Sequence, residues 1–89
     1  MAVSRADRRR DRWGRVVAVF GESGADRALD LLELVELAWH DCYGERTPSD
    51  QVIDDMLIVS DGTLDGLVAA AHLGITDWRD LRVAADKRR

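Results

Sequence analysis

The chain has 89 residues, of which 46% are hydrophobic and 34% are charged, and its formal net charge is −4. This length suffices for one hydrophobic core and not for two, and this balance excludes a disordered chain, so we expect a single domain over residues 1–89. Its apolar runs of only a few residues exclude a membrane span, which needs roughly 20.

The first predicted helix follows Ser4, a candidate N-cap, and ends at residue 20. Its apolar residues recur at spacings of three and four, as in an amphipathic helix; they are Trp13, Val16, Val17 and Phe20. The first half of this helix is nearly all charged, so we expect residues 1–12 to form a frayed basic arm.

The second predicted helix begins after Ser23, which forms an acidic variant of the capping box with Asp26. It ends at Tyr43, because Gly44 is placed to adopt the left-handed conformation that terminates helices. One apolar stripe consists of Leu29, Leu32, Val35, Trp39 and Cys42, and a neighbouring stripe consists of Leu31, Leu34 and Ala38. So broad an apolar surface is typical of a helix that is central to a bundle or packs on a second subunit. We therefore expect residues 24–43 to form the central helix.

The third predicted helix starts in the run Thr47-Pro48-Ser49-Asp50, with Thr47 as N-cap and Pro48 at the first helical position. It ends near Ser60. Its inward face consists of Val52, Ile53, Met56, Leu57 and Ser60, and the residues expected to face water are Asp50, Asp54 and Asp55. A short strand over residues 56–59 is the alternative, although no partner strand is evident in the sequence.

The fourth predicted helix follows the turn Asp61-Gly62-Thr63, is capped by Thr63 or Asp61, and ends near Leu73 at Gly74. Its core face consists of Leu64, Leu67, Val68 and Ala71.

The fifth predicted helix is capped by Thr76 and carries Asp77 in its first turn, where the helix dipole favours an acid. Its thin apolar seam consists of Trp78, Leu81 and Ala85, and we expect residues 87–89 to be a frayed tail. The sequence therefore predicts an all-α fold, a compact array or bundle of four to five helices. A shared core cluster is expected to contain Trp13, Trp39 and Trp78.

Charge is distributed unevenly along the chain. Residues 1–20 carry six arginines against two aspartates, residues 21–75 carry two arginines against twelve acids, and residues 76–89 carry five basic residues against three acids. The positive ends either pair with the acidic middle, which we favour, or present a basic arm to an anionic partner. Arginine grips phosphate and tryptophan stacks on bases, so the candidate nucleic-acid contacts are Arg5, Arg8, Arg9, Arg12 and Trp13.

No catalytic, metal or cofactor site is predicted. His40 and Cys42 point about 200° apart on a helix, and structural zinc needs four nitrogen or sulfur ligands, whereas the chain has three histidines and cysteines in all. We interpret Cys42 as a buried hydrophobe, His40 as a surface residue and His72 as partly buried. The third and fourth helices have the lengths of a helix-turn-helix, but residues 63–73 hold no arginine or lysine, which argues against DNA binding.

The favoured function is a non-enzymatic protein-interaction module, either a homodimer or a small adaptor or regulator, with a candidate interface at Leu31, Leu34 and Ala38. A nucleic-acid-associated regulator that uses the first helix is the alternative, followed by a small-molecule-binding or enzymatic subunit completed by another chain. A single cysteine and the lack of a signal-peptide-like stretch predict a cytoplasmic protein. A single lysine and the absence of asparagine are typical of a GC-rich bacterial genome.

Overall fold

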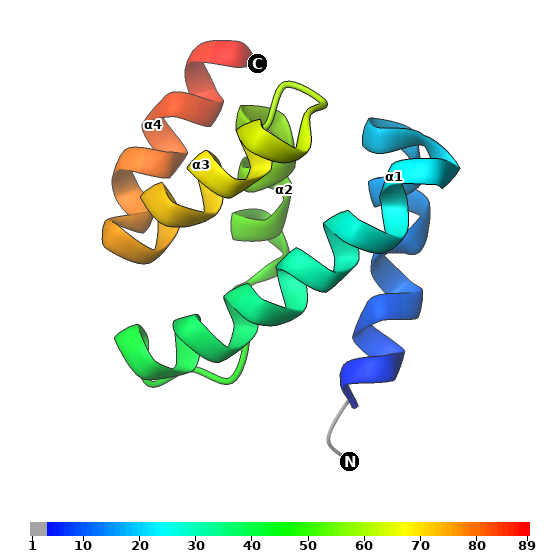
Figure 1. Cartoon of the computed structure of the whole chain (residues 1–89). Coiled ribbons are helices and arrows are strands. Elements are labelled where there is room, and N and C mark those ends of the chain that lie inside the picture. Colours follow the sequence, from blue (N-terminus) through cyan, green and yellow to red (C-terminus); the bar gives the residue numbers. More distant parts are fainter. Residues whose placement is uncertain (1–3) are drawn as a thin grey trace.

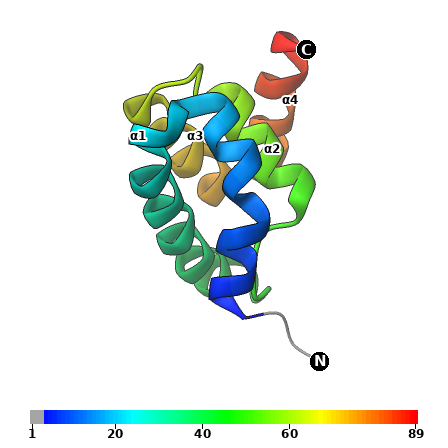
Figure 2. The same cartoon turned by 90° about the vertical axis from the view of Figure 1, so that its right-hand side faces the viewer.

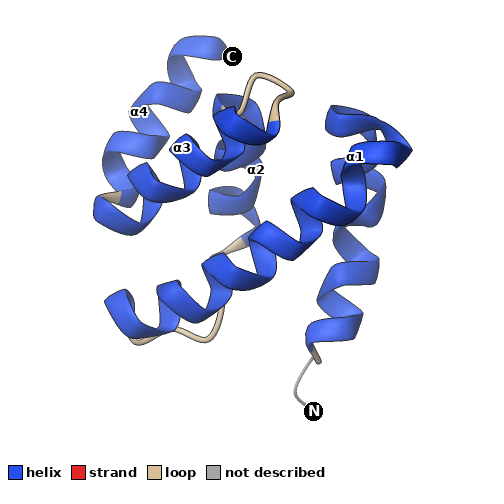
Figure 3. Cartoon of the chain, in the orientation of Figure 1, coloured by secondary structure: helices blue, strands red, loops and turns tan. Residues whose placement is uncertain are grey.

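The computed structural model describes residues 4–89, apart from the side chain of Arg5, and over that range it consists of four helices and no strand (Figures 1 and 3). The helices are α1 (Arg5–Tyr43), α2 (Asp50–Val59), α3 (Leu64–Thr76) and α4 (Trp78–Arg88). This confirms the predicted all-α fold. Residues 56–59 are helical, so the strand alternative is wrong.

A kink at Gly21 divides α1 into two arms, a first arm of residues 5–20 and a second arm of residues 22–43. Gly21 has φ 74° and ψ 168°, a conformation that is essentially confined to glycine because a Cβ atom would be strained there. The two arms meet at this kink and open away from it in Figure 1. The first two predicted helices are therefore one kinked element, and Ser23 lies inside the second arm instead of capping a new helix.

Local capping signals explain three helix ends as predicted. Ser4 forms a full capping box with Asp7 at the start of α1, and Gly44 ends α1 in the left-handed conformation, with φ 73°. Thr63 caps α3 by accepting a hydrogen bond from the backbone N–H of Gly66 at 2.9 Å.

The N-cap of α2 is Ser49, and the predicted cap at Thr47 is wrong. Ser49 accepts from the backbone N–H of Val52 at 3.3 Å, and the helix begins at Asp50. The hydroxyl of Thr47 instead accepts a hydrogen bond from Arg12 at 3.0 Å. The expected capping group is therefore bonded to a residue far away in the sequence.

Gly74 does not end α3, because the helix continues to Thr76. The glycine is buried, and a Cβ atom there would lie 2.9 Å from Cε of Met56 and 3.1 Å from Cδ2 of Leu81. It therefore allows close packing against neighbouring helices. The predicted cap of the last helix is also displaced by one residue, since Asp77 caps α4 and Thr76 closes α3.

The hydrophobic core lies between the second arm of α1 and the three shorter helices. α3 packs against each of the other three helices, so it occupies the centre that we had expected residues 24–43 to occupy. The second arm still buries most of its predicted main stripe, namely Leu29, Leu32, Val35 and Trp39. Cys42 is exposed, contrary to prediction, because the packed stripe ends with Trp39 and Tyr43, whose rings are 4.4 Å apart.

The three tryptophans do not form the expected cluster. Trp39 is buried, whereas Trp13 and Trp78 are 40% and 39% exposed. The ring of Trp78 lies 5.7 Å from the guanidinium carbon of Arg82, in a cation–π arrangement at the surface. Helical spacing placed each ring on an apolar face, but only one of these faces is fully covered.

Candidate interaction surface and charged clusters

Glu36, in the second arm of α1, is a buried carboxylate held by two arginines of the first arm. Nε of Arg8 donates to Oε2 at 2.8 Å, and Nη1 of Arg12 donates to Oε1 at 2.8 Å. The side chains of Arg12 and Glu36 are almost wholly buried, so their charges interact in a medium of low polarity. This pairing joins the two arms.

Arg12 and Arg15 extend the same network toward α2. Arg12 donates to the hydroxyl of Thr47 at 3.0 Å, and Arg15 forms ion pairs with Asp54 and, at 3.7 Å, with Asp50. The first arm is thus bonded both to its own second arm and to the start of α2.

Arg9 faces three acids of the second arm. It lies 2.8 Å from Asp30 and 3.4 Å from both Asp26 and Glu33. The hydrogen bond to Asp30 raises the pKa of Arg9, and the hydrogen bond to Glu36 raises the pKa of Arg8. Both ion pairs therefore stabilise the charged form of the arginine in the folded chain.

The predicted nucleic-acid contacts are therefore placed as follows. Arg8, Arg9 and Arg12 form ion pairs within the chain, and Trp13 is partly exposed on the same arm. The side chain of Arg5 lies outside the described residues. The segment expected to fray is helical from Arg5 onward, and its charges are bonded to the acidic middle of the chain.

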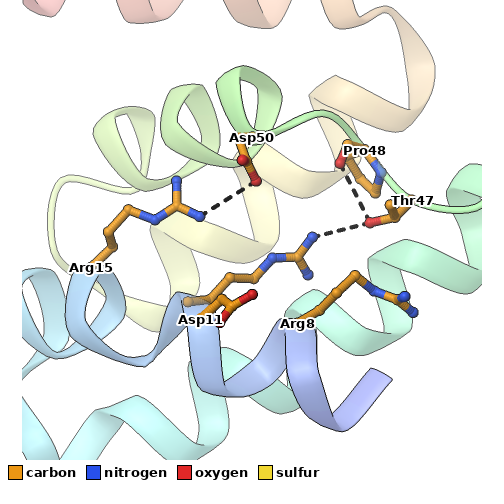
Figure 4. A pocket seen from close by; sticks show the side chains of 7 residues that line it. Arg8, Asp11, Arg15, Thr47, Pro48 and Asp50 are labelled. Atoms are coloured by element: carbon orange, nitrogen blue, oxygen red, sulfur yellow. Dashed lines mark hydrogen bonds and ion pairs between the residues drawn. The ribbon is translucent and has the colours of Figure 1, made fainter. Parts of the chain in front are cut away.

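A polar cavity of about 340 Å³ opens between the first arm and the start of α2 (Figure 4). It is lined by Arg8, Asp11, Arg12, Arg15, Thr47, Pro48 and Asp50. Figure 4 shows Arg15 directed toward Asp50 on the facing helix. An anion entering this cavity would have to compete with carboxylates for each of the three arginines.

Asp55 contradicts the prediction that it faces water, since it is fully buried. Its Oδ2 accepts from Nε of Arg82 at 2.6 Å, and its Oδ1 accepts from Nη2 of Arg89 at 2.6 Å. Two arginines thus neutralise one buried carboxylate, as they do at Glu36.

Two residues of the expected frayed tail, Arg88 and Arg89, also bond to other parts of the chain. Arg88 lies 3.0 Å from Asp61, and the hydrogen bonds to Asp61 and Asp55 raise the pKa values of Arg88 and Arg89. These ion pairs link the C-terminal end of α4 to Asp55 in α2 and to Asp61 in the turn between α2 and α3.

His40, Cys42 and His72 are all exposed and do not converge. The expectation that His72 is partly buried is wrong, because it lies on the solvent face of α3. Within residues 4–89, no group of three or more His, Cys, Asp or Glu side chains is placed to hold a metal ion. None of the helices in the described part of the chain is long and apolar enough to cross a membrane.

The second arm of α1 exposes an apolar strip on the side away from the core. Leu34 is 62% exposed and Leu37 is 52% exposed, while Leu31 and Ala38 are half-buried beside them. We call this surface the outer face of α1 and define it as Arg27, Asp30, Leu31, Leu34, Leu37, Ala38 and Asp41. Leu31, Leu34 and Ala38 were predicted to lie on this surface. Leu37 was not, although its spacing of three from Leu34 indicates the same side of the helix.

No protein-family model, curated protein or solved structure matches this chain.

Proposed function

We propose that the protein is a non-enzymatic protein-interaction module, a homodimer or a small adaptor or regulator, that binds its partner through the outer face of α1. The observation that carries this proposal is the exposure of Leu34 and Leu37 on a helix whose opposite face forms the core. Burying apolar surface contributes about 25 cal/mol per Å², so covering two leucines favours association.

The composition of the outer face supports this role. Leucines occupy its middle, and charged residues, including Arg27, Asp30 and Asp41, lie around them. An apolar centre with a polar rim is the usual anatomy of a protein interface. The module needs no metal or cofactor. We place it in the cytoplasm, where the exposed thiol of Cys42 stays reduced.

The nucleic-acid alternative has less support from the charges. Arg8, Arg9 and Arg12 already bind carboxylates, and phosphate contacts supply most of the affinity of nucleic-acid-binding modules. No observation favours the alternative of an enzymatic or small-molecule-binding subunit.

Site-specific photocrosslinking in living cells tests the proposal. A photoreactive amino acid replaces Leu37 in one variant and Val83 in a matched control, because Val83 is an aliphatic residue on α4 with 53% exposure, close to that of Leu37. We expect crosslinked species from position 37 and none from position 83.

The masses of the crosslinked species identify the class of partner, whether it is the chain itself, another protein or a nucleic acid. A protein adduct specific to position 37 supports the proposal. Equal crosslinking from both positions, or none from position 37, would overturn it.

A further inference from the structure

The outer face of α1 is self-complementary about Leu34. Arg27 precedes Leu34 by seven residues and Asp41 follows it by seven; Leu31 precedes it by three and Leu37 follows it by three. Arg27 and Asp41 are oppositely charged, and Leu31, Leu34 and Leu37 between them are apolar.

Helical geometry puts these residues in matching positions. At 100° and 1.5 Å per residue, Arg27 and Asp41 lie about 10 Å below and above Leu34 and about 20° to either side of it. Leu31 and Leu37 lie about 5 Å below and above Leu34, about 60° to either side. A twofold axis between two antiparallel helices at Leu34 reverses the height of each residue and keeps it on its own side of the interface. It therefore brings Arg27 of one copy to the height of Asp41 of the other, with both near the centre line, and it places Leu31 opposite Ala38.

We infer that the partner of the outer face is a second copy of this chain, bound antiparallel along the second arm of α1 with Leu34 on the twofold axis. This inference rests on the proposed function and names its partner. An interface of this kind presents the same patch from both copies, so its residues must complement themselves, as these do.

The two charged residues of this pairing are available within the chain. Arg27 is exposed and forms no ion pair with any other residue of the range 4–89. The side chain of Asp41 is 86% exposed, and its partner is the adjacent His40 at 3.9 Å. Other arginines of α1, such as Arg9 and Arg15, are already bonded to acids.

The remaining acid of the outer face does not oppose the pairing. Asp30 would lie on the same side of the interface as Leu37 of the second copy, and its carboxylate is bonded to Arg9 at 2.8 Å. It therefore brings no unpaired charge to the interface. The second arm runs along the left-hand edge of the molecule in Figure 2.

Charge also selects the direction of pairing. In a parallel pair, Arg27 would face Arg27 and Asp41 would face Asp41 of the second copy, and like charges at such positions repel. The antiparallel pair replaces both repulsions with attractions, so the proposal commits to one orientation.

A charge-swap series measured by analytical ultracentrifugation tests the inference. The variants are Arg27→Asp, Asp41→Arg and the double variant that carries both changes. Each dimer contains two copies of the charged contact, so we expect either single variant to weaken dimerisation about tenfold or more, which corresponds to roughly 1.4 kcal/mol. The double variant exchanges the charges and should restore dimerisation to within about threefold of the original.

Two controls separate this effect from misfolding and from general charge. Arg46→Asp changes an exposed arginine away from the outer face and should leave dimerisation unchanged. Circular dichroism should show equal helicity for all variants, because Arg27 and Asp41 are exposed.

A thiol crosslink locates the axis independently. In a Cys42→Ser background, Leu34→Cys places two thiols on the twofold axis, within the short separation that a disulfide requires, whereas Val83→Cys does not. We expect oxidation to yield a covalent dimer from the first variant and a monomer from the second.

Each failure has a distinct meaning. A chain that remains monomeric at all accessible concentrations overturns the inference, and photocrosslinks from position 37 to another protein would still support the proposed function. A dimer that ignores the single variants, or that the double variant fails to restore, overturns the antiparallel pairing. Absence of any crosslink from position 37 overturns the proposed function itself.

Discussion

Nη1 of Arg12 donates to Oε1 of Glu36 at 2.8 Å, and the two side chains are only 5% and 4% exposed. The residues are 24 positions apart, on the two arms that Gly21 separates. Burying two charges is costly unless each one is paired, so either partner alone is a strongly unfavourable group in this position.

We expect Glu36→Ala to lower the free energy of unfolding by about 3–5 kcal/mol, because it leaves Arg12 charged and buried without its carboxylate. Replacing both partners, as in Arg12→Met with Glu36→Leu, should cost less than Glu36→Ala alone, since no charge is then left buried. Urea denaturation followed by circular dichroism measures both. Equal losses in the single and the double variant would contradict this explanation.

Gly66→Ala should destabilise the fold by about 2–3 kcal/mol through a steric clash. A Cβ atom at this position would collide with the carbonyl oxygen of Ser60 and lie 2.8 Å from its carbonyl carbon, and neither backbone atom can move without shifting the turn before α3. Gly14→Ala is the matched control. It lies inside α1 with open space around it, so we expect a gain of about 0.5–1 kcal/mol from helix propensity. Thermal denaturation should show the two midpoints moving in opposite directions.

Gly21→Ala should cost about 1–3 kcal/mol, because its positive φ combined with an extended ψ strains any L-residue with a Cβ atom. A chemically synthesised chain with D-alanine at this position is the control, since the mirror image of the conformation lies in the broad β region. We expect D-alanine to preserve stability in urea denaturation. Equal destabilisation by both alanines would show that the methyl group itself, and not the backbone conformation, is the cause.

Acid should weaken the N-cap of α4. Oδ1 of Asp77 accepts from the backbone N–H of Arg79 at 2.9 Å, and this bond lowers the pKa of Asp77, with a further contribution from the side chain of Arg79. A carboxylate whose folded-state pKa is lowered stabilises the fold above its unfolded pKa of about 3.9, and this stabilisation is lost as the pH falls through the lowered value.

The variant Asp77→Asn keeps a capping oxygen but does not titrate. We therefore expect the thermal midpoint of the original chain to exceed that of Asp77→Asn by more at pH 7 than at pH 2. A difference between the two midpoints that does not depend on pH would contradict the assignment.

Signals confined to a few neighbouring residues predicted much of the fold. The helix starts at Ser4 and Thr63 and the helix end at Gly44 were correct because each cap bonds within its own first or last turn. Where a predicted helix end was wrong, a contact with a residue far away in the sequence determined the local structure. The hydroxyl of Thr47 bonds to Arg12 and does not cap α2, and Gly74 lies inside α3, packed close to Met56 and Leu81.

The candidate interface was predictable in part for the same reason. Helical spacing alone identified Leu31, Leu34 and Ala38 as a second apolar stripe. Which side of that stripe remains exposed depends on where α3 and the first arm of α1 pack. Their packing leaves Leu37 exposed.

The sequence by itself determined the helical class, the positions of most helices and the pairing of positive ends with an acidic middle, because periodicity, caps and net charge act along the chain. Only the tertiary structure decided that Glu36 and Asp55, among many similar acids, are the buried ones. Each is paired with arginines at least 24 residues away, and such partners become neighbours only when the chain folds back on itself.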